Sequence, residues 1–326
     1  MLIVLYCFVL HFEGIESIIY LKIRCTKGWL PILLKDKTTK KNIIWATSSY
    51  EQFGNQYADD KQITTEALTG LNPILLQPRI MKTMEQQQAR TKVHAEVFTP
   101  AWICNKMNNY CDEEWFYRKN VFNILQDKQW DITQERILFP PDKTWKQYVD
   151  SRRLEITCGE APYIASRYDA STGEAIPIKD RIGILDRKLR IINENADNEG
   201  EWLKWTIRAF QSVYGYEYQG DNLLIGRINL LITFVDYLSD RWNREAAIDE
   251  LKKIANIIAW NFWQMDGLIG TVPLGEPEEE IHQYSLFEMF GNEENKPEDK
   301  KSPRCRIFDW RADKSILYES MKKQEG

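Results

Sequence analysis

The sequence predicts an α/β protein built on a doubly wound, mainly parallel sheet. Its central part alternates apolar runs that fit buried strands, at 154–156, 212–217 and 256–262, with longer segments of helical periodicity. Strands alternating with helices of this length are typical of parallel sheets, because parallel strands need long crossover connections. Each strand also carries an acid at or near its carboxyl end, where such sheets bind ligands.

Composition indicates a globular chain with reduced thiols. Of its 326 residues 43% are hydrophobic, which is ample for one large domain or two. The six cysteines form no Cys-x-x-Cys pair and there are only three histidines. We therefore expect no disulfide framework and no metal site, and a cytoplasmic location. The net charge of −5 gives no overall nucleic-acid signature.

Residues 1–92 are expected to form an N-terminal α+β extension. The apolar segment 2–10 is too short to span a bilayer, so no membrane association is expected. We interpret this segment as a buried strand or as a tail added by a misassigned start codon. Apolar runs at 29–34 and 43–45 flank the basic segment 35–42, a pattern typical of a β-hairpin. Residues 48–92 are polar, and part of this segment is expected to be helical.

A helix is expected to begin at Thr99 and Pro100. Threonine is a favourable N-cap and proline fits the first helical position. The apolar face of this helix would hold Trp102, Ile103 and Met107. The stretch 113–150 resembles an insertion, within which Phe139-Pro140-Pro141-Asp142 predicts a loop.

The segment 154–164 is interpreted as a buried strand that ends in a Cys158-Gly159 turn and leads toward a helix. Such a turn lets a nucleotide-like cofactor approach the backbone, and the next helix offers N–H groups to it. A single Cys-Gly turn is more often an ordinary loop, so the remaining segments decide its meaning.

Helical periodicity continues after this turn. It covers 180–195, 201–213, 221–238 and 244–254. Asp221 fits the N-cap of the third of these helices, and the last one leads into the predicted strand 256–262. Residues 291–304 form a charged linker, and 305–326 a strand pair with a tail.

Four segments within residues 93–290 occur in a characteristic order. They are Phe98-Thr99-Pro100, Glu155-Ile156-Thr157-Cys158-Gly159-Glu160-Ala161, Tyr214-Gly215-Tyr216-Glu217 and Asn261-Phe262-Trp263-Gln264-Met265-Asp266-Gly267-Leu268. Together they resemble the Phe-x-Thr-Pro segment, the first glycine motif, the strand-end acid and the Asn-Ile-x-x-Gly-Asp-x-Leu motif of N6-adenine DNA methyltransferases of restriction-modification systems. The chain is also similar to proteins labelled restriction endonuclease subunit M.

The resemblance implies a Rossmann-like, S-adenosylmethionine-dependent methyltransferase domain that acts on DNA. The residues it assigns to the cofactor are Phe98, Thr99, Pro100, Glu155, Cys158, Gly159, Glu217, Tyr218 and Asp266. In the family the acid matching Glu217 binds the ribose hydroxyls, and the acid matching Asp266 faces the adenine amino group. Both roles suit a carboxylate, which accepts hydrogen bonds from hydroxyl and amino donors.

The sequence departs from the family in two places. Glu155 replaces an aspartate, and Glu160, Ala161 and Pro162 stand where small residues and a second glycine are usual, which would crowd the methionine half of the cofactor. The catalytic Asn/Asp-Pro-Pro-Tyr/Phe motif is absent, because the adjacent prolines 140 and 141 precede the glycine motif and follow a phenylalanine. The catalytic residues are therefore unassigned.

Three interpretations stay open. The first is a split enzyme, whose catalytic motif lies on a partner methyltransferase or restriction subunit; we favour it, because the sequence ends about where the next strand and catalytic loop are expected. The second is a non-catalytic DNA- or partner-binding subunit. The third is a metal-dependent nuclease, since Asp142 and Glu155-Ile156-Thr157 have the spacing of a nuclease pair. In the third interpretation Thr157 stands where a lysine is expected.

Overall fold

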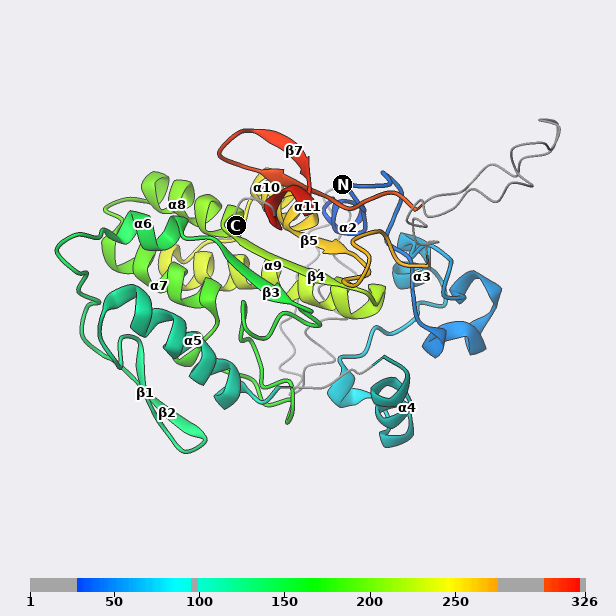
Figure 1. Ribbon diagram of the computed structural model, residues 1–326, viewed down its shortest axis with the longest axis horizontal. Helices are drawn as coiled ribbons and strands as arrows, with labels where there is room; N and C mark the ends of the chain where they lie inside the picture. Colours follow the sequence, from blue (N-terminus) through cyan, green and yellow to red (C-terminus); the bar gives the residue numbers. More distant parts are fainter. Residues whose placement is uncertain (1–27, 95–98, 275–301, 323–326) are drawn as a thin grey trace, which may run out of the picture.

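A three-stranded parallel sheet lies at the centre of the protein (Figure 1). The computed structural model describes residues 28–94, 99–274 and 302–322. The strands β3 (Arg153–Ile156), β4 (Val213–Glu217) and β5 (Phe262–Gln264) pair in that order, with Leu154 opposite Tyr214 and Tyr216 opposite Trp263. The predicted α/β class and parallel sheet are confirmed.

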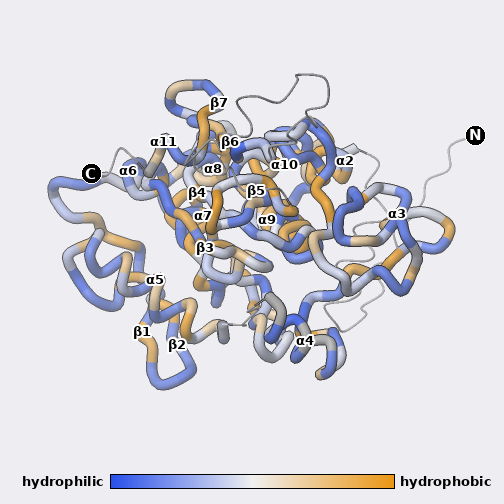
Figure 2. The backbone as a smooth tube through the Cα atoms, turned by 45° about the vertical axis from the view of Figure 1, so that its right-hand side comes forward, coloured by the Kyte–Doolittle hydropathy of each residue, from blue (hydrophilic) through white to orange (hydrophobic). Residues whose placement is uncertain are grey.

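The helices between the strands form the main core with one face of the sheet. They are α7 (Ile184–Asn195), α8 (Glu199–Gln211), α9 (Gly220–Trp242) and α10 (Ile248–Asn261). Their apolar side chains share one cluster with Val213 and Phe262. Helix α9 is buried around most of its circumference, including polar residues such as Arg227 and Asn229 whose side chains bond to neighbouring backbone carbonyls. Hydrophobic segments accordingly gather around β4, β5 and α9 in Figure 2.

The opposite face of the sheet is covered only in part. The hairpin of β6 (Arg306–Asp309) and β7 (Lys314–Leu317), followed by α11 (Glu319–Lys322), packs on Tyr214, Tyr216 and Trp263. This confirms the predicted C-terminal strand pair. By register Leu154 and Ile156 share this face, but they are 43% and 64% exposed. The prediction that β3 is fully buried is therefore wrong, because β3 is an edge strand that buries only the side carrying Glu155.

Two predictions on the β4–α9–α10–β5 unit are also wrong. Residues 256–261 continue α10, and the strand begins only at Phe262. Short apolar runs do not distinguish a buried helix from a buried strand. The N-cap of α9 is Gln219 and not Asp221. Asp221 lies in the first turn of the helix, and its carboxylate forms ion pairs with Lys82 and Arg90.

The N-terminal extension is mostly short helices. They are α2 (Leu30–Leu33), the 3₁₀ helices η1 (Ser48–Phe53), η2 (Asn55–Tyr57) and η3 (Arg79–Met81), and α3 (Thr65–Thr69) and α4 (Met84–His94). The predicted hairpin is wrong, because the residues expected to form its first strand form helix α2 instead. Pro31 fits the first helical turn, and Leu30 and Leu33 lie at helical spacing in the core. Only an isolated bridge between Lys35 and Asn42 closes the turn.

Helix α5 (Ala101–Phe116) begins where it was predicted but with a different cap and a different buried face. Its N-cap is Pro100 rather than Thr99, and the amide of Ala101 donates to Asp169 Oδ2 at 2.9 Å. Met107 is 50% exposed. Half of the residues on the face turned inward are polar, and Asn105 and Asp112 among them accept hydrogen bonds from Arg187. The spacing of apolar residues therefore did not identify the buried face of this helix. That face consists of Ala101, Cys104, Asn105, Asn108, Asp112 and Phe116.

The stretch after α5 contains a small hairpin and a helix. Strand β1 (Asn123–Gln126) pairs antiparallel with β2 (Gln129–Ile132), and α6 (Trp145–Asp150) follows. Residues 139–142 form the predicted loop. In the described part of the chain no helix has the length and hydropathy needed to cross a membrane.

Candidate functional site

A left-handed turn joins the end of β3 to the segment that leads toward α7. Gly159 has a φ of 51° and Ala161 a φ of 63°. The amide of Cys158 donates to Tyr216 O at 2.8 Å, and the amide of Ala161 donates to Cys158 O at 2.7 Å. A left-handed conformation costs a residue with a Cβ about 1–2 kcal/mol. Ala161 therefore holds a backbone conformation that glycine would adopt without this cost.

Helix α9 packs against this turn at Gly226. A Cβ added to Gly226 would lie 3.1 Å from Gly159 O and 3.3 Å from the carbonyl carbon of Glu160. Such a distance is tighter than almost all real Cβ contacts, so the helix approaches the turn as closely as a glycine allows. The turn is thus held in place between β3 and α9.

Glu217, at the carboxyl end of β4, binds the turn directly. Its Oε2 accepts from the Gly159 amide at 2.9 Å. Its Oε1 accepts from the amides of Tyr218 and Gln219 at 3.0 and 3.1 Å. The side chain is 8% exposed. Two of the residues that the resemblance assigns to a cofactor are therefore in contact, and a carboxylate fixes the relative position of two adjacent strand ends.

Glu155 faces the interior on the other side of the turn. Its Oε1 accepts from the Tyr163 amide at 3.3 Å, whereas Oε2 has no hydrogen-bond partner among the described residues. Burial raises the pKa of Glu155 well above its ordinary value, and the nearby Glu217 adds to the shift. The carboxyl group is thus held toward its neutral form, which suits a buried group that supports the turn.

The start of α5 lies against the same turn. Cys104 Sγ lies 3.8 Å from Thr99 O. Burial raises the pKa of Tyr163, and a hydrogen bond with the Thr99 side chain opposes that shift. Thr99 and Pro100 therefore adjoin the turn through Cys104 and Tyr163. Phe98 lies outside the described residues.

Tyr218 and Asp266 occupy the adjacent strand ends. The amide of Met265 donates to Glu217 O at 3.0 Å, so the pairing of β4 with β5 extends to the residue before Asp266. Asp266 Oδ1 accepts from the Leu268 amide at 2.9 Å and shapes the turn after β5. Burial raises the pKa of Tyr218, and the nearby Asp266 contributes. All the described residues of the predicted cofactor set therefore lie at one end of the sheet.

The residues of the nuclease interpretation are not brought together as a metal site. Asp142 is exposed on the loop between β2 and α6, where Phe139 packs on Trp115, whereas Glu155 is buried beneath the turn. Across residues 28–94, 99–274 and 302–322, no group of three or more His, Cys, Asp or Glu side chains could hold a metal ion.

A buried ion cluster at the first turn of α9 was not predicted. Asp221 Oδ2 accepts from Lys82 Nζ and Arg90 Nη1, both at 3.0 Å, and from the Tyr50 hydroxyl at 3.1 Å. Burial alone would raise the pKa of Asp221, but Lys82 and Arg90 lower it well below its ordinary value. The partners are more than 130 residues apart in sequence, so no local pattern could have indicated the cluster.

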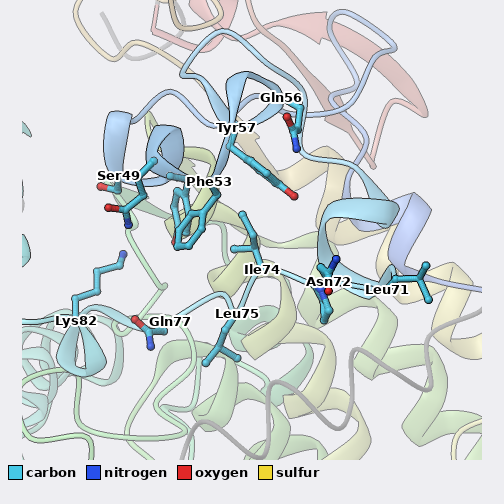
Figure 3. A pocket seen from close by; sticks show the side chains of 13 residues that line it. Ser49, Phe53, Gln56, Tyr57, Leu71, Asn72, Ile74, Leu75, Gln77 and Lys82 are labelled. Atoms are coloured by element: carbon cyan, nitrogen blue, oxygen red, sulfur yellow. The ribbon is translucent and has the colours of Figure 1, made fainter.

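A cavity of about 830 Å³ opens beside this cluster (Figure 3). Its walls come from η1, η2 and the segment after α3. They are Ser49, Tyr50, Gln52, Phe53, Gln56, Tyr57, Leu71, Asn72, Pro73, Ile74, Leu75, Gln77 and Lys82. None of the residues that the resemblance assigns to a cofactor lines this cavity.

No protein-family model, curated protein or solved structure matches this chain. The indications of its function are therefore the motifs and the geometry of the strand ends.

Proposed function

We propose that the chain is a methyltransferase subunit with a Rossmann-like fold. In this proposal it binds S-adenosylmethionine and contributes to N6-adenine methylation of DNA in a restriction-modification system, with a partner chain supplying the catalytic motif. The observation that carries the proposal is the bond from the Gly159 amide to the Glu217 carboxylate, which joins two motifs of the resembled family at the carboxyl ends of adjacent parallel strands.

The departures in the glycine motif leave the solvent side of the turn open. The methyl group of Ala161 is fully buried, and Glu160 is buried with its carboxylate bonded to the Arg79 amide at 2.8 Å and to the Tyr168 hydroxyl. Among the residues that the structure describes, nothing lies within 4 Å of the position that a Cβ on Gly159 would occupy. A ligand could therefore approach the backbone there, and the crowding expected from Glu160 and Ala161 is absent.

The arrangement suits binding and orientation of the cofactor rather than proton transfer. Thr99 and Pro100 would lie on its methionine side, Glu217 would receive its ribose hydroxyls, and Asp266 would receive its adenine amino group. When bound, S-adenosylmethionine supplies the methyl group on its sulfonium sulfur. The adenine amine of the DNA would attack that methyl carbon, forming an N–C bond as the C–S bond breaks, with S-adenosylhomocysteine leaving and a proton lost from the amine to solvent or the partner chain. The role of this chain would be to hold the donor in position.

The open edge of β3 supports a partner chain. Among the described residues β3 pairs only with β4, and Leu154 and Ile156 project from a face that the C-terminal hairpin leaves uncovered. Parallel sheets are normally covered on both faces, and an unpaired apolar edge favours the addition of a strand. A strand of the partner beside β3 would place a catalytic loop next to the glycine turn.

Replacing Glu217 with alanine is expected to weaken S-adenosylmethionine binding at least tenfold in calorimetry, because the variant loses the ribose acceptor. Asp266→Asn should weaken it as well while preserving side-chain shape. Glu135→Ala, an exposed glutamate between β2 and α6, is the matched control. Unchanged affinity in the Glu217 and Asp266 variants would refute these two assignments. No binding by the wild type, alone or with its genomic neighbour, would refute the cofactor role itself.

Ile156→Asp is expected to abolish co-purification with the proposed partner chain, for which the first candidate is any methyltransferase chain encoded next to this gene. A charge on the β3 edge would need to be desolvated when a strand is added. Leu138→Asp, at an exposed leucine on the distant loop before Phe139, should leave the complex intact. Equal recovery of the complex with both variants would contradict partner addition at this edge.

The second candidate is a non-catalytic DNA- or partner-binding subunit, which the missing catalytic motif favours. It predicts DNA binding that S-adenosylmethionine does not alter, and no methyl transfer after reconstitution with the neighbouring chain. Magnesium-dependent DNA cleavage by this chain alone would favour the nuclease interpretation instead.

A further inference from the structure

The cavity beside α9 has an apolar middle and two polar ends. Phe53 and Tyr57 stand over Ile74 in its middle (Figure 3). The rings of Phe53 and Tyr57 make an edge contact, with their centroids 6.4 Å apart. Phe53 is 56% exposed, so its ring is accessible to a ligand that enters the cavity. The middle therefore offers an aromatic surface for a flat, apolar ring system.

The charges of the lining select against cationic ligands. Among the described residues the lining contains no acidic side chain and a single cation, Lys82, in a chain with 48 acidic and 43 basic residues. Lys82 lies with Ser49 at one end of the cavity (Figure 3). Asp221 accepts one of the three N–H donors of the lysine, at 3.0 Å. The Ser49 hydroxyl already bonds to Arg90 Nη1 and Thr47 Oγ1, both at 3.0 Å. This end therefore suits an anionic group through the charge and the remaining N–H donors of Lys82.

The remaining polar side chains are neutral amides. Gln52, Gln56, Asn72 and Gln77 line the cavity. Figure 3 shows Gln56, Asn72 and Gln77 around its aromatic middle. An amide carries both a donor and an acceptor, so it matches the mixed donor and acceptor edge of a nucleobase. A sugar-binding site that relies on carboxylates would instead have acidic side chains in its lining. An aromatic middle, amides around it and a cation at one end together match the parts of a nucleotide.

We propose that this cavity binds a nucleotide, with its base against Phe53, its base edge on the amides and its phosphate at Lys82. This site goes beyond the proposed methyltransferase function and does not depend on it, because the cavity shares no residue with the predicted cofactor set. The same chemistry has two sources, a free nucleotide or an unstacked base in a DNA strand. Stacking of bases on aromatic side chains is how proteins hold unpaired nucleotides.

The test is fluorescence anisotropy on the full chain with two probes, etheno-AMP and a single-stranded oligonucleotide that carries one 2-aminopurine. We expect the wild type to bind at least one of them. Phe53→Ala should weaken that binding roughly tenfold, the loss typical for removal of one stacking ring. Gln56→Glu should weaken it as well, because it places an acid beside the base. Tyr110→Ala, which removes a 60% exposed ring from α5, is the matched control.

The outcomes separate this site from the cofactor site. Binding of etheno-AMP identifies a free nucleotide as the ligand, and binding of the oligonucleotide alone identifies DNA; either supports the proposal. Failure of both probes to bind, or equal losses in Phe53→Ala and Tyr110→Ala, would overturn it. Displacement of the probe by S-adenosylmethionine would also overturn it, since the probe would then occupy the cofactor site. Failure of the chain to bind S-adenosylmethionine leaves this result unaffected.

Discussion

Asp221→Ala is expected to lower the free energy of unfolding by about 3–5 kcal/mol, the cost of leaving buried charges without their partner. The variant would leave Lys82 and Arg90 in the interior without the carboxylate that both of them contact. Urea unfolding followed by tryptophan fluorescence would measure the loss. Asp60→Ala removes an exposed ion pair with Lys61 and should change stability by less than about 1 kcal/mol.

The same cluster predicts a pH dependence. The pKa of Asp221 in the folded protein is below its ordinary value of about 3.9, so its contribution to stability is complete above that value. The contribution is lost as the pH falls through the lower, folded-state pKa. Wild-type stability should therefore fall more steeply below about pH 4 than that of Asp221→Asn. If the free energy of unfolding changed with pH in the same way in both proteins, the ion pairing of Asp221 with Lys82 and Arg90 would be contradicted.

Gly220→Ala is expected to detach the segment 43–46 from the first turn of α9. A Cβ at position 220 would lie 1.9 Å from Ile44 O. The backbone fixes the position of the Cβ and Ile44 O is itself a backbone atom, so neither can rotate away. The amide of Gly220 also donates to Trp45 O at 2.9 Å, a bond that the displacement would break. Overpacking of this kind costs about 1–3 kcal/mol or more.

Limited proteolysis would detect the detachment as faster cleavage between residues 28 and 94, and urea unfolding would detect the lost stability. Gly200→Ala is the control, because a Cβ there meets only Asn198 Oδ1, at 3.3 Å. That variant should be neutral or slightly stabilising, since alanine favours helix over glycine. A Gly220→Ala protein as resistant to protease as Gly200→Ala would show that the close approach is absent.

The elements with regular periodicity were predictable, and those with ambiguous patterns were not. Helices α7 and α8 carry apolar residues on one side and were found from their spacing. The end of α10 and the start of β5 form one run, Ile257 to Phe262, that is apolar except for Asn261 and fits either structure. β3 has the composition of a buried strand, but its burial depends on a neighbouring strand that the described residues do not supply.

The candidate site was predictable where it follows strand ends, because parallel strands bring their carboxyl ends to one edge. Gly159 and Glu217 meet there for that reason. The α5 cap was wrong because Asp169, far along the chain, binds the helix amide in place of Thr99. The cavity was missed altogether, since its lining has no motif and only the folded chain brings Phe53 near Ile74.

The attachment of the N-terminal extension to α9 has a consequence for synthesis of the chain. Arg90 precedes its partner Asp221 by 131 residues, so the extension leaves the ribosome long before its docking site exists. At a translation rate of about 5–20 residues per second this delay is on the order of ten seconds. During that time Leu33 and Trp45, both fully buried in the finished protein, have no core to enter. Nascent chains shorter than about 220 residues should therefore be clients of ribosome-associated chaperones.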